Sequence, residues 1–245
     1  MNLKGRNALI TGGSTGIGKA IAMHLAEEGM NIAINYSRSQ KEAQETVQAI
    51  ESLGVKGEMY QANVAHDFEV KSMCEKVIKD FGGLDVLINN AGTTNYVPLC
   101  NLDELLDEYW DQAFNVNVKG AFYTSRACKA ELTKNKGCIV NITSIAGLNG
   151  KGSSIAYAAS KAAGISLTKS LAHILAPEVR VNSIAPGVVL TRWVEGHDDH
   201  VEQYKQTPLG RVATPEDVAG MTRAIIQGGD FVTGQTVVVD GGWTL

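Results

Sequence analysis

The sequence predicts an α/β protein built on one doubly wound sheet of seven mainly parallel strands, with helices on both faces. Short apolar runs alternate with longer helix-patterned segments along all 245 residues, which is the pattern of βαβ units. A glycine-rich turn follows the first apolar run directly, where such sheets bind phosphate groups. No linker or low-complexity segment interrupts the alternation. We therefore expect a single domain over residues 1–245.

Each strand is predicted from a short run rich in apolar and β-branched residues. The predicted strands are NALIT (7–11), NIAINY (31–36), GEMYQAN (57–63), LDVLINN (84–90), GCIVNIT (137–143), VRVNSIA (179–185) and TVVVD (236–240). Because the carboxyl ends of parallel strands meet at one edge of the sheet, ligands are expected to bind outside that edge.

The helices are predicted in the segments between the strands. The first covers residues 17–28 and ends at Gly29, a residue type that favours helix C-termini. The last covers residues 215–227, with Thr214 as its N-cap and Pro215 at its first position.

Composition argues against several classes of partner. The 22 basic and 26 acidic residues give a formal net charge of −4, so no overall attraction to nucleic acid or to an anionic membrane is expected. The four cysteines form no C-x-x-C pair and no zinc-like spacing, which indicates reduced thiols and a cytoplasmic protein. We expect no signal peptide and no membrane span, because the first strand begins almost at once and no apolar stretch is long enough.

The glycine-rich turn TGGSTGIG (11–18) lies between the first predicted strand and the first predicted helix. Glycine permits a tight turn and the close approach of a pyrophosphate, and the following helix directs unpaired N–H groups and its positive dipole end at the anion. A glycine turn alone is weak evidence, since loops use glycine anyway. Its position after a strand makes a dinucleotide site the favoured interpretation.

Two further motifs follow predicted strands. In NNAG (89–92), small residues would let a dinucleotide lie close to the backbone, and Asn89 and Asn90 are expected to tie neighbouring strands together. Ser144 follows the fifth strand and places a hydroxyl at the carboxyl edge of the sheet. Taken alone, the first motif is a turn, and the serine has the commoner role of a helix cap or loop residue.

Tyr157 and Lys161 lie in a segment of mostly small residues, SSIAYAASKAAG (153–164), that favours helix. Residues four apart on a helix share one face, so the phenol and the ammonium are predicted to point the same way. A nearby cation favours the ionised form of a phenol, whose ordinary pKa is about 10. The pair is a candidate for proton transfer, although a core tyrosine beside a solvent-exposed lysine is the commoner arrangement.

The joint order of these motifs resembles that of the short-chain dehydrogenase/reductase family, over essentially the whole chain. The motifs are TGGSTGIG, NNAG, the asparagine of NVNVKG, the serine of ITSIAG, YAASK, APGVVLT and VVVDGG. The resemblance implies a Rossmann-type fold and an enzyme that interconverts a ketone and a secondary alcohol by hydride transfer with a nicotinamide cofactor. It also implies four catalytic residues, Asn117, Ser144, Tyr157 and Lys161.

In this family pattern, Tyr157 matches the general acid/base and Ser144 the hydroxyl that binds the carbonyl. Lys161 matches the residue that binds the nicotinamide ribose and, aided by the positive oxidised nicotinamide, lowers the pKa of the tyrosine. Asn117 matches the residue that holds a water molecule connecting Lys161 to solvent. The resemblance further implies cofactor contacts by Gly12, Ser14, Thr15, Gly16, Ile17, Gly18, Ser37, Arg38, Asn63, Val64, Asn90, Ala91, Gly92, Tyr157, Lys161, Pro186, Gly187, Val189 and Thr191.

NADP(H) is the preferred cofactor, with NAD(H) as the alternative. NAD-preferring relatives commonly end the second strand with an acid, whereas here Arg38 offers a positive charge to a 2′-phosphate. Arg38 can also be read as a solvated loop cation. Two departures bear on the cofactor: the glycine turn lacks the basic residue of many NADP-dependent relatives, and Asn63 replaces an aspartate that usually hydrogen-bonds adenine.

The segment 188–211 is expected to form a flap over the substrate, with Trp193 and Tyr204 either lining the pocket or simply packing. HDDH (197–200) has residue types that bind metals, but a solvated loop is the favoured interpretation and no metal is assigned.

Within the family, the overall pattern is most similar to the 3-oxoacyl-[acyl carrier protein] reductases of fatty-acid biosynthesis. A 3-oxoacyl thioester is therefore the first substrate candidate, and acyl carrier protein a candidate partner. That acidic partner requires basic residues near the pocket mouth, for which Lys129, Lys134 and Lys136 are candidates. His173 stands where those reductases commonly have arginine, so whether acyl carrier protein is a partner stays open.

Other functions stay open beside this one. Sugars, polyols and other small ketones are alternative substrates on the same core. A nucleotide-sugar epimerase and a non-catalytic dinucleotide-sensing protein are lower alternatives. Long helices are expected over 103–131 and 154–175, and because relatives pair these helices across a two-fold axis, the resemblance implies a homotetramer.

Overall fold

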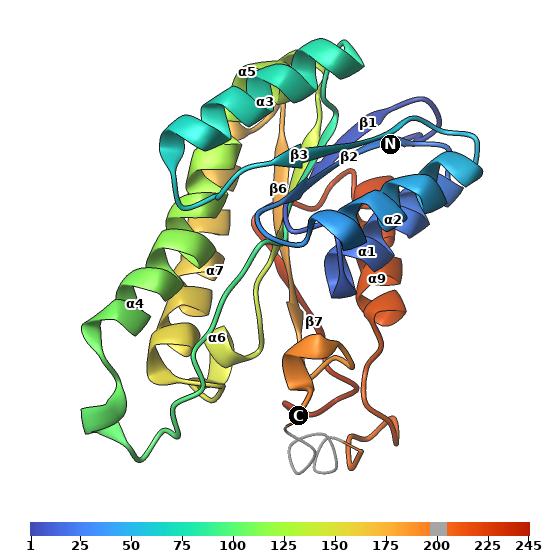
Figure 1. Ribbon diagram of the computed structural model, residues 1–245. Helices are drawn as coiled ribbons and strands as arrows, with labels where there is room; N and C mark the ends of the chain where they lie inside the picture. The colour runs from blue at the N-terminus through green and yellow to red at the C-terminus, as the bar shows by residue number, and fades with distance from the viewer. Residues whose placement is uncertain (197–204) are drawn as a thin grey trace.

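The seven apolar runs form one sheet, with strand order β3-β2-β1-β4-β5-β6-β7 (Figure 1). The computed structural model describes residues 1–196 and 205–245. The strands are β1 (Asn7–Ile10), β2 (Asn31–Tyr36), β3 (Gly57–Gln61), β4 (Val86–Asn89), β5 (Cys138–Ile142), β6 (Arg180–Pro186) and β7 (Thr236–Val239). All seven predicted strands are confirmed, and every pair in the sheet is parallel.

Helices cover both faces of the sheet, as predicted (Figure 1). On one face lie α1 (Gly16–Glu27), α2 (Gln40–Ser52) and α9 (Pro215–Gly228), and on the other lie α3 (Asp67–Phe81), α4 (Asp107–Phe114), α5 (Ala121–Lys134) and α7 (Ile155–Leu175). The short α6 (Ala146–Asn149) precedes α7, and single 3-10 turns occur at η1 (Leu102–Glu104) and η3 (Arg192–Val194). Within the described residues, no helix is both long enough and apolar enough to cross a membrane.

The strands supply two hydrophobic cores because successive side chains point to opposite faces of a sheet. In β1, Ala8 and Ile10 pack into the core under α1, α2 and α9. Leu9 lies between them in sequence and packs into the core under α3, α5 and α7. All three are fully buried, so the sheet is covered on both faces, as parallel sheets require.

The helix ends follow local chemistry. The last predicted helix is confirmed: Thr214 and Asp217 form a reciprocal capping box, with Pro215 in the first turn. The first predicted helix begins one residue earlier than expected, at Gly16.

The helix expected over 103–131 is wrong in its bounds. Residues 102–104 form a 3-10 turn, and the regular helix begins only at Asp107. Between α4 and α5, the segment η2 (Asn115–Gly120) is a π-helical turn. Such wider turns are rare inside helices and often occur at functional sites, because they displace the backbone locally.

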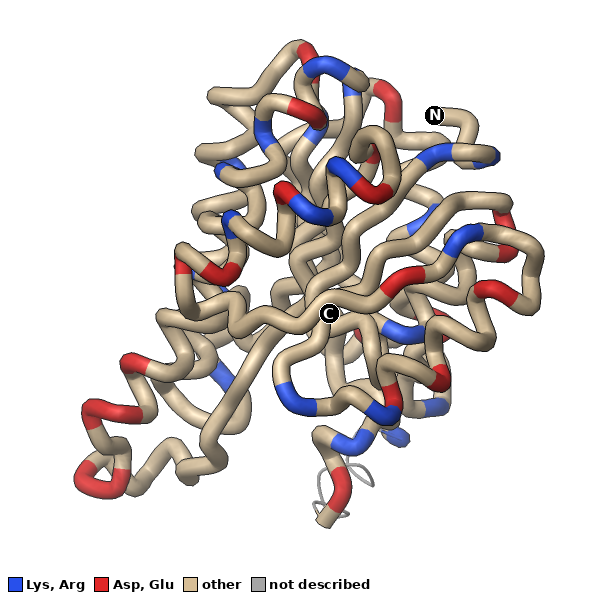
Figure 2. The backbone as a smooth tube through the Cα atoms, turned by 45° about the horizontal axis from the view of Figure 1, so that its top comes forward, with Lys and Arg blue, Asp and Glu red and all other residues tan. Residues whose placement is uncertain are grey.

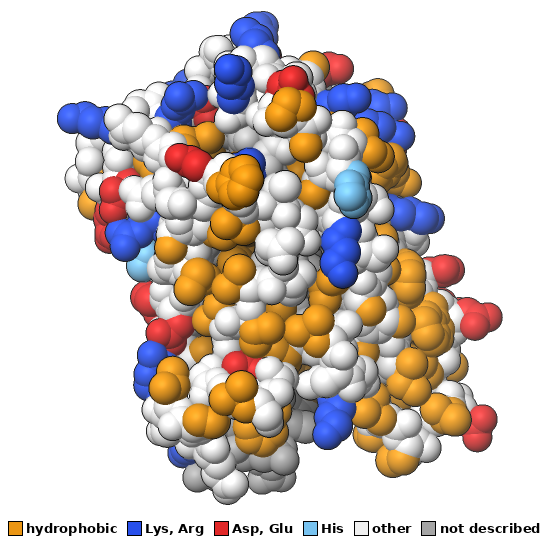
Figure 3. Space-filling view, turned by 180° about the vertical axis from the view of Figure 1, so that it is seen from behind, with side chains coloured by type: hydrophobic (Ala, Val, Ile, Leu, Met, Phe, Trp, Pro, Cys, Tyr) orange, Lys and Arg blue, Asp and Glu red, His pale blue; other side chains and the backbone are white. Residues whose placement is uncertain are grey.

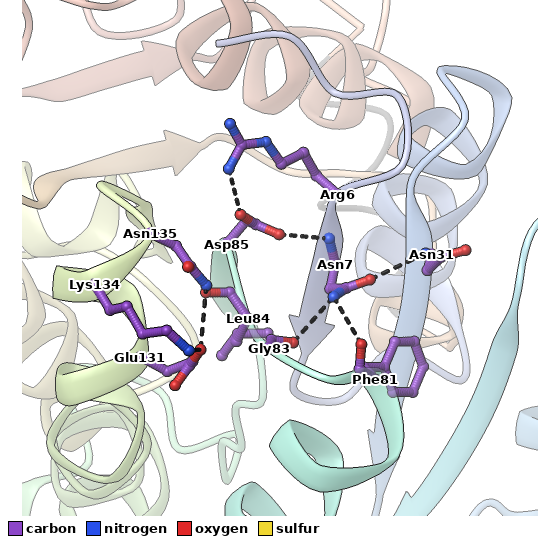
Figure 4. A network of polar contacts seen from close by, with 10 residues as sticks. All are labelled: Arg6, Asn7, Asn31, Phe81, Gly83, Leu84, Asp85, Glu131, Lys134 and Asn135. Carbon is purple, nitrogen blue, oxygen red and sulfur yellow. Dashed lines mark hydrogen bonds and ion pairs between the residues drawn. The ribbon is translucent and has the colours of Figure 1, made fainter.

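Polar side chains fasten the amino-terminal edge of the sheet (Figure 4). Asp85 accepts a 2.6 Å hydrogen bond from the Arg6 guanidinium and a 2.9 Å bond from the Asn7 backbone N–H. The Asn7 side chain accepts a 3.0 Å bond from Asn31 on β2. α5 ends at the same edge, where Asn135 donates to the Leu84 carbonyl. The motifs singled out in the sequence all lie toward the opposite edge.

Candidate active site

The glycine turn folds tightly between β1 and α1. Gly12 and Gly16 have φ angles of +61° and +53°, the left-handed region that glycine adopts without strain. A Cβ at Gly18 would lie 2.3 Å from the Gly12 carbonyl oxygen, so only glycine fits there. Thr15, the N-cap of α1, makes no side-chain capping bond, which leaves the first N–H groups of this helix open toward a ligand.

Asn35 organises this turn, which sequence reasoning missed. Its side chain is 2% exposed and accepts a hydrogen bond from the Gly12 N–H at 3.3 Å. The Asn35 carbonyl accepts from the Gly13 N–H at 3.0 Å. The end of β2 therefore holds the glycine turn in place, and no local sequence signal marks an asparagine for that role.

The NNAG motif joins the strands, as predicted. Asn90 donates 3.0 Å hydrogen bonds to the carbonyls of Thr11 and Gly12, and the Thr11 hydroxyl accepts from the N–H groups of Asn90 and Ala91. Asn89 donates to Asn141 of β5 at 2.8 Å. This network fixes the backbone of the motif against the glycine turn.

Lys161 and Tyr157 share one face of α7, as predicted. The Lys161 ammonium lies 5.6 Å from the centre of the Tyr157 ring and donates a 2.9 Å hydrogen bond to the Ile142 carbonyl at the end of β5. Lys161 is only 6% exposed. The alternative of a lysine that extends into water is therefore wrong.

Burial governs the pKa values of both groups. Burial raises the pKa of Tyr157 to about 12, although a hydrogen bond with the Ser144 side chain acts to lower it. Burial lowers the pKa of Lys161 to about 8. In the protein alone, the pKa of Tyr157 thus moves opposite to the expected direction, because the cost of burying a phenolate exceeds the stabilisation that nearby groups supply.

Ser144 makes the local backbone contact that is common for a serine in a loop before a helix. Its hydroxyl oxygen accepts a 3.1 Å hydrogen bond from the Ala146 N–H, the local capping role. Ser144 also lies close enough to Tyr157 for its hydroxyl to act to lower the pKa of the phenol.

Asn117 lies in the π-helical turn and is 8% exposed. Its amide group donates to the Thr93 carbonyl at 3.0 Å and to the Ser160 hydroxyl at 2.9 Å, and its oxygen accepts from the Thr93 N–H at 2.8 Å. A small enclosed cavity of about 10 Å³ lies beside Asn117 and Lys161, close to the smallest volume that holds a water molecule. Asn117 thus braces the loop after β4 against α7.

A cavity of about 720 Å³ opens beside Tyr157 at the carboxyl edge of the sheet. Its walls are mainly apolar and aromatic, and its charged lining residues are Lys151 and Lys161. Tyr96, Lys151 and Trp243 were not expected there, since they come from three distant segments and belong to no motif. The lining includes Ile17, Asn90, Tyr96, Val97, Leu99, Ser144, Ile145, Lys151, Tyr157, Lys161, Pro186, Gly187, Val189, Thr191, Trp193, Val194 and Trp243.

Trp193 lines this cavity, one of its two predicted roles. The Tyr96 hydroxyl donates a 3.0 Å hydrogen bond to the Trp193 carbonyl, and Trp193 is 39% exposed. Its ring atom Cη2 lies 3.4 Å from the point that a Cβ on Gly92 would occupy, and the Lys161 Nζ lies 3.7 Å from the same point. The indole therefore reaches the centre of the site. The other candidates in this segment, HDDH (197–200) and Tyr204, lie outside the described residues.

Part of the predicted cofactor set lines the large cavity: Ile17, Asn90, Tyr157, Lys161, Pro186, Gly187, Val189 and Thr191. Thr191 packs over the glycine turn, with its methyl group 3.3 Å from where a Cβ of Gly16 would lie. Ser37 and Arg38 are exposed just after β2. Asn63 accepts a 3.1 Å bond from the Ala65 N–H, so one lone pair of its amide oxygen is already used inside the loop.

None of the three lysines expected near the pocket mouth, Lys129, Lys134 and Lys136, is among the residues that line the large cavity. Lys134 pairs with Glu131 at the end of α5, at the amino-terminal edge of the sheet (Figure 4), and Lys136 lies just before β5. This part of the expectation is wrong because α5 runs from the site toward the opposite edge. The arm over 101–112, which continues from Leu99 of the cavity wall, carries five acidic residues and no basic one (Figure 2).

Comparisons with known proteins extend these findings. A family model described as Enoyl-(Acyl carrier protein) reductase matches residues 12–244. The chain is 38% identical over 242 residues to 3-oxoacyl-[acyl-carrier-protein] reductase of Staphylococcus aureus, covering 97% of each chain. It is similar to a solved short-chain dehydrogenase from Burkholderia cenocepacia in complex with NADP, with a TM-score of 0.91, 35% identity and 99% of each chain covered. It is also similar to a blue fluorescent protein from a metagenomic library in complex with NADPH, with a TM-score of 0.92, 32% identity and full coverage of both chains.

Proposed function

The chain belongs to the short-chain dehydrogenase/reductase family, and we propose that it is an NADP(H)-dependent oxidoreductase that interconverts a ketone and a secondary alcohol. One observation carries this proposal. Tyr157, Ser144 and Lys161 line one cavity of about 720 Å³, and the Lys161 ammonium lies 5.6 Å from the centre of the Tyr157 ring. An acid, a hydroxyl donor and a buried cation thus converge where a carbonyl compound can enter.

The residues present fit a dinucleotide. The glycine turn has no side chain that would block a pyrophosphate, and the first turn of α1 has no capping side chain to compete for its N–H groups. Lys161 would bind the ribose hydroxyls, and the backbone at Val189 and the hydroxyl of Thr191 would hold the carboxamide. The nicotinamide supplies the hydride donor or acceptor.

Tyr157 is proposed as the general acid in the direction of reduction. Because burial raises its pKa to about 12, the phenol stays protonated at neutral pH, the form that can donate a proton. Ser144 and Tyr157 would donate hydrogen bonds to the oxygen of the carbonyl as negative charge develops there. The Lys161 cation would stabilise the phenolate that Tyr157 leaves behind.

Asn117 and the small cavity suggest how the proton is replaced. The cavity beside Lys161 and Asn117 has room for about one water molecule and is lined by polar groups that include Thr11, Asn89 and Asn141. We assign Asn117 the role of shaping this cavity by joining the loop after β4 to α7.

The preference for NADP(H) rests on the end of β2. No acidic residue occupies positions 35–38, and Arg38 is exposed there, without an ion pair to any residue that the structure describes. A 2′-phosphate would find a cation and no repelling carboxylate. The solved relatives bound to NADP and NADPH support the same choice.

A 3-oxoacyl thioester remains the first substrate candidate, supported by the relative from S. aureus. The acidic arm over 101–112 favours a second candidate, a small free ketone, because an acidic carrier protein would be repelled beside the cavity.

A homotetramer is also proposed: hydrophobic side chains cover much of the middle of one face (Figure 3), and β7 is an unpaired edge strand.

The proposed function is tested by following the oxidation of NADPH, and separately of NADH, by the purified protein. The substrates are a 3-oxoacyl group on acyl carrier protein, the same group on a short thiol, and a panel of small ketones. We expect turnover that Tyr157→Phe reduces at least 100-fold, while Tyr109→Phe, on α4 outside the cavity, leaves it unchanged. Cofactor binding without any turnover would favour a sensing protein instead.

A further inference from the structure

A second arginine reaches the end of β2 from a distant part of the chain. The guanidinium nitrogens Nη1 and Nη2 of Arg192 both lie 3.4 Å from the Ser39 hydroxyl oxygen, although the two residues are 153 positions apart. Ser39 follows Arg38 directly. The Arg192 guanidinium therefore lies beside the residue that directly follows Arg38.

These arginines lack a balancing charge among the residues that the structure describes. Neither takes part in any of the ion pairs found there, and the acid in the first turn of α2, Glu42, pairs with neither. Two arginines without a counter-ion near the end of β2 leave positive charge that a bound anion would neutralise. The uncompensated positive charge therefore favours the binding of an anionic ligand there.

A purely structural role explains the arrangement poorly. The contact of Arg192 with Ser39 is long for a hydrogen bond, and the side chain is exposed. Exposed polar contacts of this kind contribute little to stability, and an arginine is costly to order. The Ser39 hydroxyl binds the Arg192 guanidinium only weakly, and the charged oxygens of a phosphate would bind it more strongly.

We propose that Arg192 is a specificity-determining residue that binds the 2′-phosphate of NADP(H) together with Arg38. This inference rests on the proposed function, in which Arg38 faces that phosphate. A guanidinium can donate two parallel hydrogen bonds to phosphate oxygens, and two guanidinium groups match a dianion.

The position of Arg192 joins this phosphate site to the substrate cavity. Thr191, the preceding residue, packs over the glycine turn, and Trp193, the next residue, lies against Tyr157 and is held through its carbonyl by Tyr96. A phosphate that binds Arg192 therefore also fixes η3, which forms one wall of the cavity. A cofactor lacking the 2′-phosphate would leave this wall less ordered.

The test measures the binding of adenosine 2′,5′-bisphosphate and of adenosine 5′-monophosphate by calorimetry, since they differ only in the 2′-phosphate. For wild type we expect clearly tighter binding of the bisphosphate. Arg192→Ala should weaken bisphosphate binding at least about tenfold and leave the monophosphate unchanged. Arg192→Lys should recover part of the lost affinity, because lysine restores the positive charge but not the paired N–H donors of the planar guanidinium. Lys41→Ala, which removes a nearby exposed cation of α2, is the matched control and should have little effect.

The outcomes separate this inference from the proposed function. If wild type does not distinguish the two nucleotides, the assignment of NADP(H) itself is overturned. If wild type prefers the bisphosphate but Arg192→Ala binds both nucleotides as wild type does, only the role of Arg192 is overturned. Equal weakening of both nucleotides by Arg192→Ala would also overturn it. Thermal unfolding of each variant establishes that any loss does not come from misfolding.

Discussion

The indole of Trp193 meets the phenol ring of Tyr157 edge-on, with 6.1 Å between the ring centroids and 62° between the planes. Aromatic pairs favour this geometry, so the contact holds η3 against the face of α7 that carries Tyr157 and Lys161. In the protein alone, the indole also approaches Gly92, within the space that groups bound to Lys161 would need. Cofactor binding should therefore change the surroundings of Trp193.

We expect oxidised NADP to change the tryptophan fluorescence of the protein, and most of that change to come from Trp193. Trp193→Phe should remove most of the signal. The chain has three tryptophans, of which Trp110 lies on α4 outside the cavity, so Trp110→Phe should keep the change. Because Trp243 also lines the cavity, Trp243→Phe is compared as well, and an undiminished change in Trp193→Phe would contradict the prediction.

The buried Lys161 should make stability depend on pH. Its pKa falls from 10.5 to about 8 on folding, so between these values the unfolded chain binds more protons than the folded one, and the stability contributed by this site rises with pH. The full effect is on the order of 3 kcal/mol. Below about pH 8 the folded protein bears the whole cost of burying the charge.

Denaturant unfolding of wild type and Lys161→Met between pH 8 and 10 measures this effect. The free energy of unfolding of wild type should rise relative to that of the variant across this range. Above pH 10 the raised pKa of Tyr157 acts in the opposite direction, since the unfolded chain then loses a proton that the folded chain keeps. Lys169→Met, an exposed lysine on the same helix, should show no such trend, and a flat difference for Lys161→Met would contradict the prediction.

Two acidic substitutions near the end of β2 should have different effects. Arg38→Asp should raise the KM for NADP(H) at least about tenfold and spare NAD(H), because it replaces an attractive charge by a repulsive one. Asn35→Asp should instead destabilise the protein by about 3 kcal/mol, since the buried amide group donates to the carbonyls of Tyr60 and Ala62. Steady-state kinetics with both cofactors and chemical unfolding distinguish the two; unchanged KM values in Arg38→Asp would remove the basis for the NADP(H) assignment.

Two glycine substitutions form a matched pair. Gly18→Ala should disrupt the glycine turn, because its Cβ would lie 2.3 Å from the Gly12 carbonyl oxygen and 2.5 Å from the Asn90 side chain. Gly220→Ala, within α9, has no atom within 4 Å of the new methyl group and should stabilise the protein by about 0.5 to 1 kcal/mol. Thermal unfolding and nucleotide binding test both. Normal nucleotide binding by Gly18→Ala would mean that the turn adapts more easily than its packing indicates.

The strands, the glycine turn and the shared face of Tyr157 and Lys161 could be predicted because each follows from neighbouring residues. Apolar periodicity determines a strand, and a spacing of four places two side chains on one helix face. The direction of the Tyr157 pKa could not be predicted, since it depends on burial in the folded chain.

The contacts between loops could not be predicted from the sequence either. Tyr96 and Trp193 are 97 positions apart; Tyr96 lies in an irregular segment and Trp193 in the short η3, and neither segment has a periodic pattern. The acidic arm illustrates the same point: its charges were evident in the sequence, but its place beside the cavity became evident only from the structure. The lysines of α5 were misplaced because the direction of a helix relative to the site follows from topology, not composition.

The strand order lets the sheet grow outward while the ribosome is still making the chain. β2 and β3 extend the sheet on one side of β1, and β4, β5, β6 and β7 then add in turn on the other side. No strand has to enter between two that are already paired, so each newly emerged segment finds an open edge. The glycine turn and the Asn90 bonds that brace it are complete once β4 and its loop have emerged. The glycine turn and its brace are thus synthesised before Tyr157 and Lys161 exist.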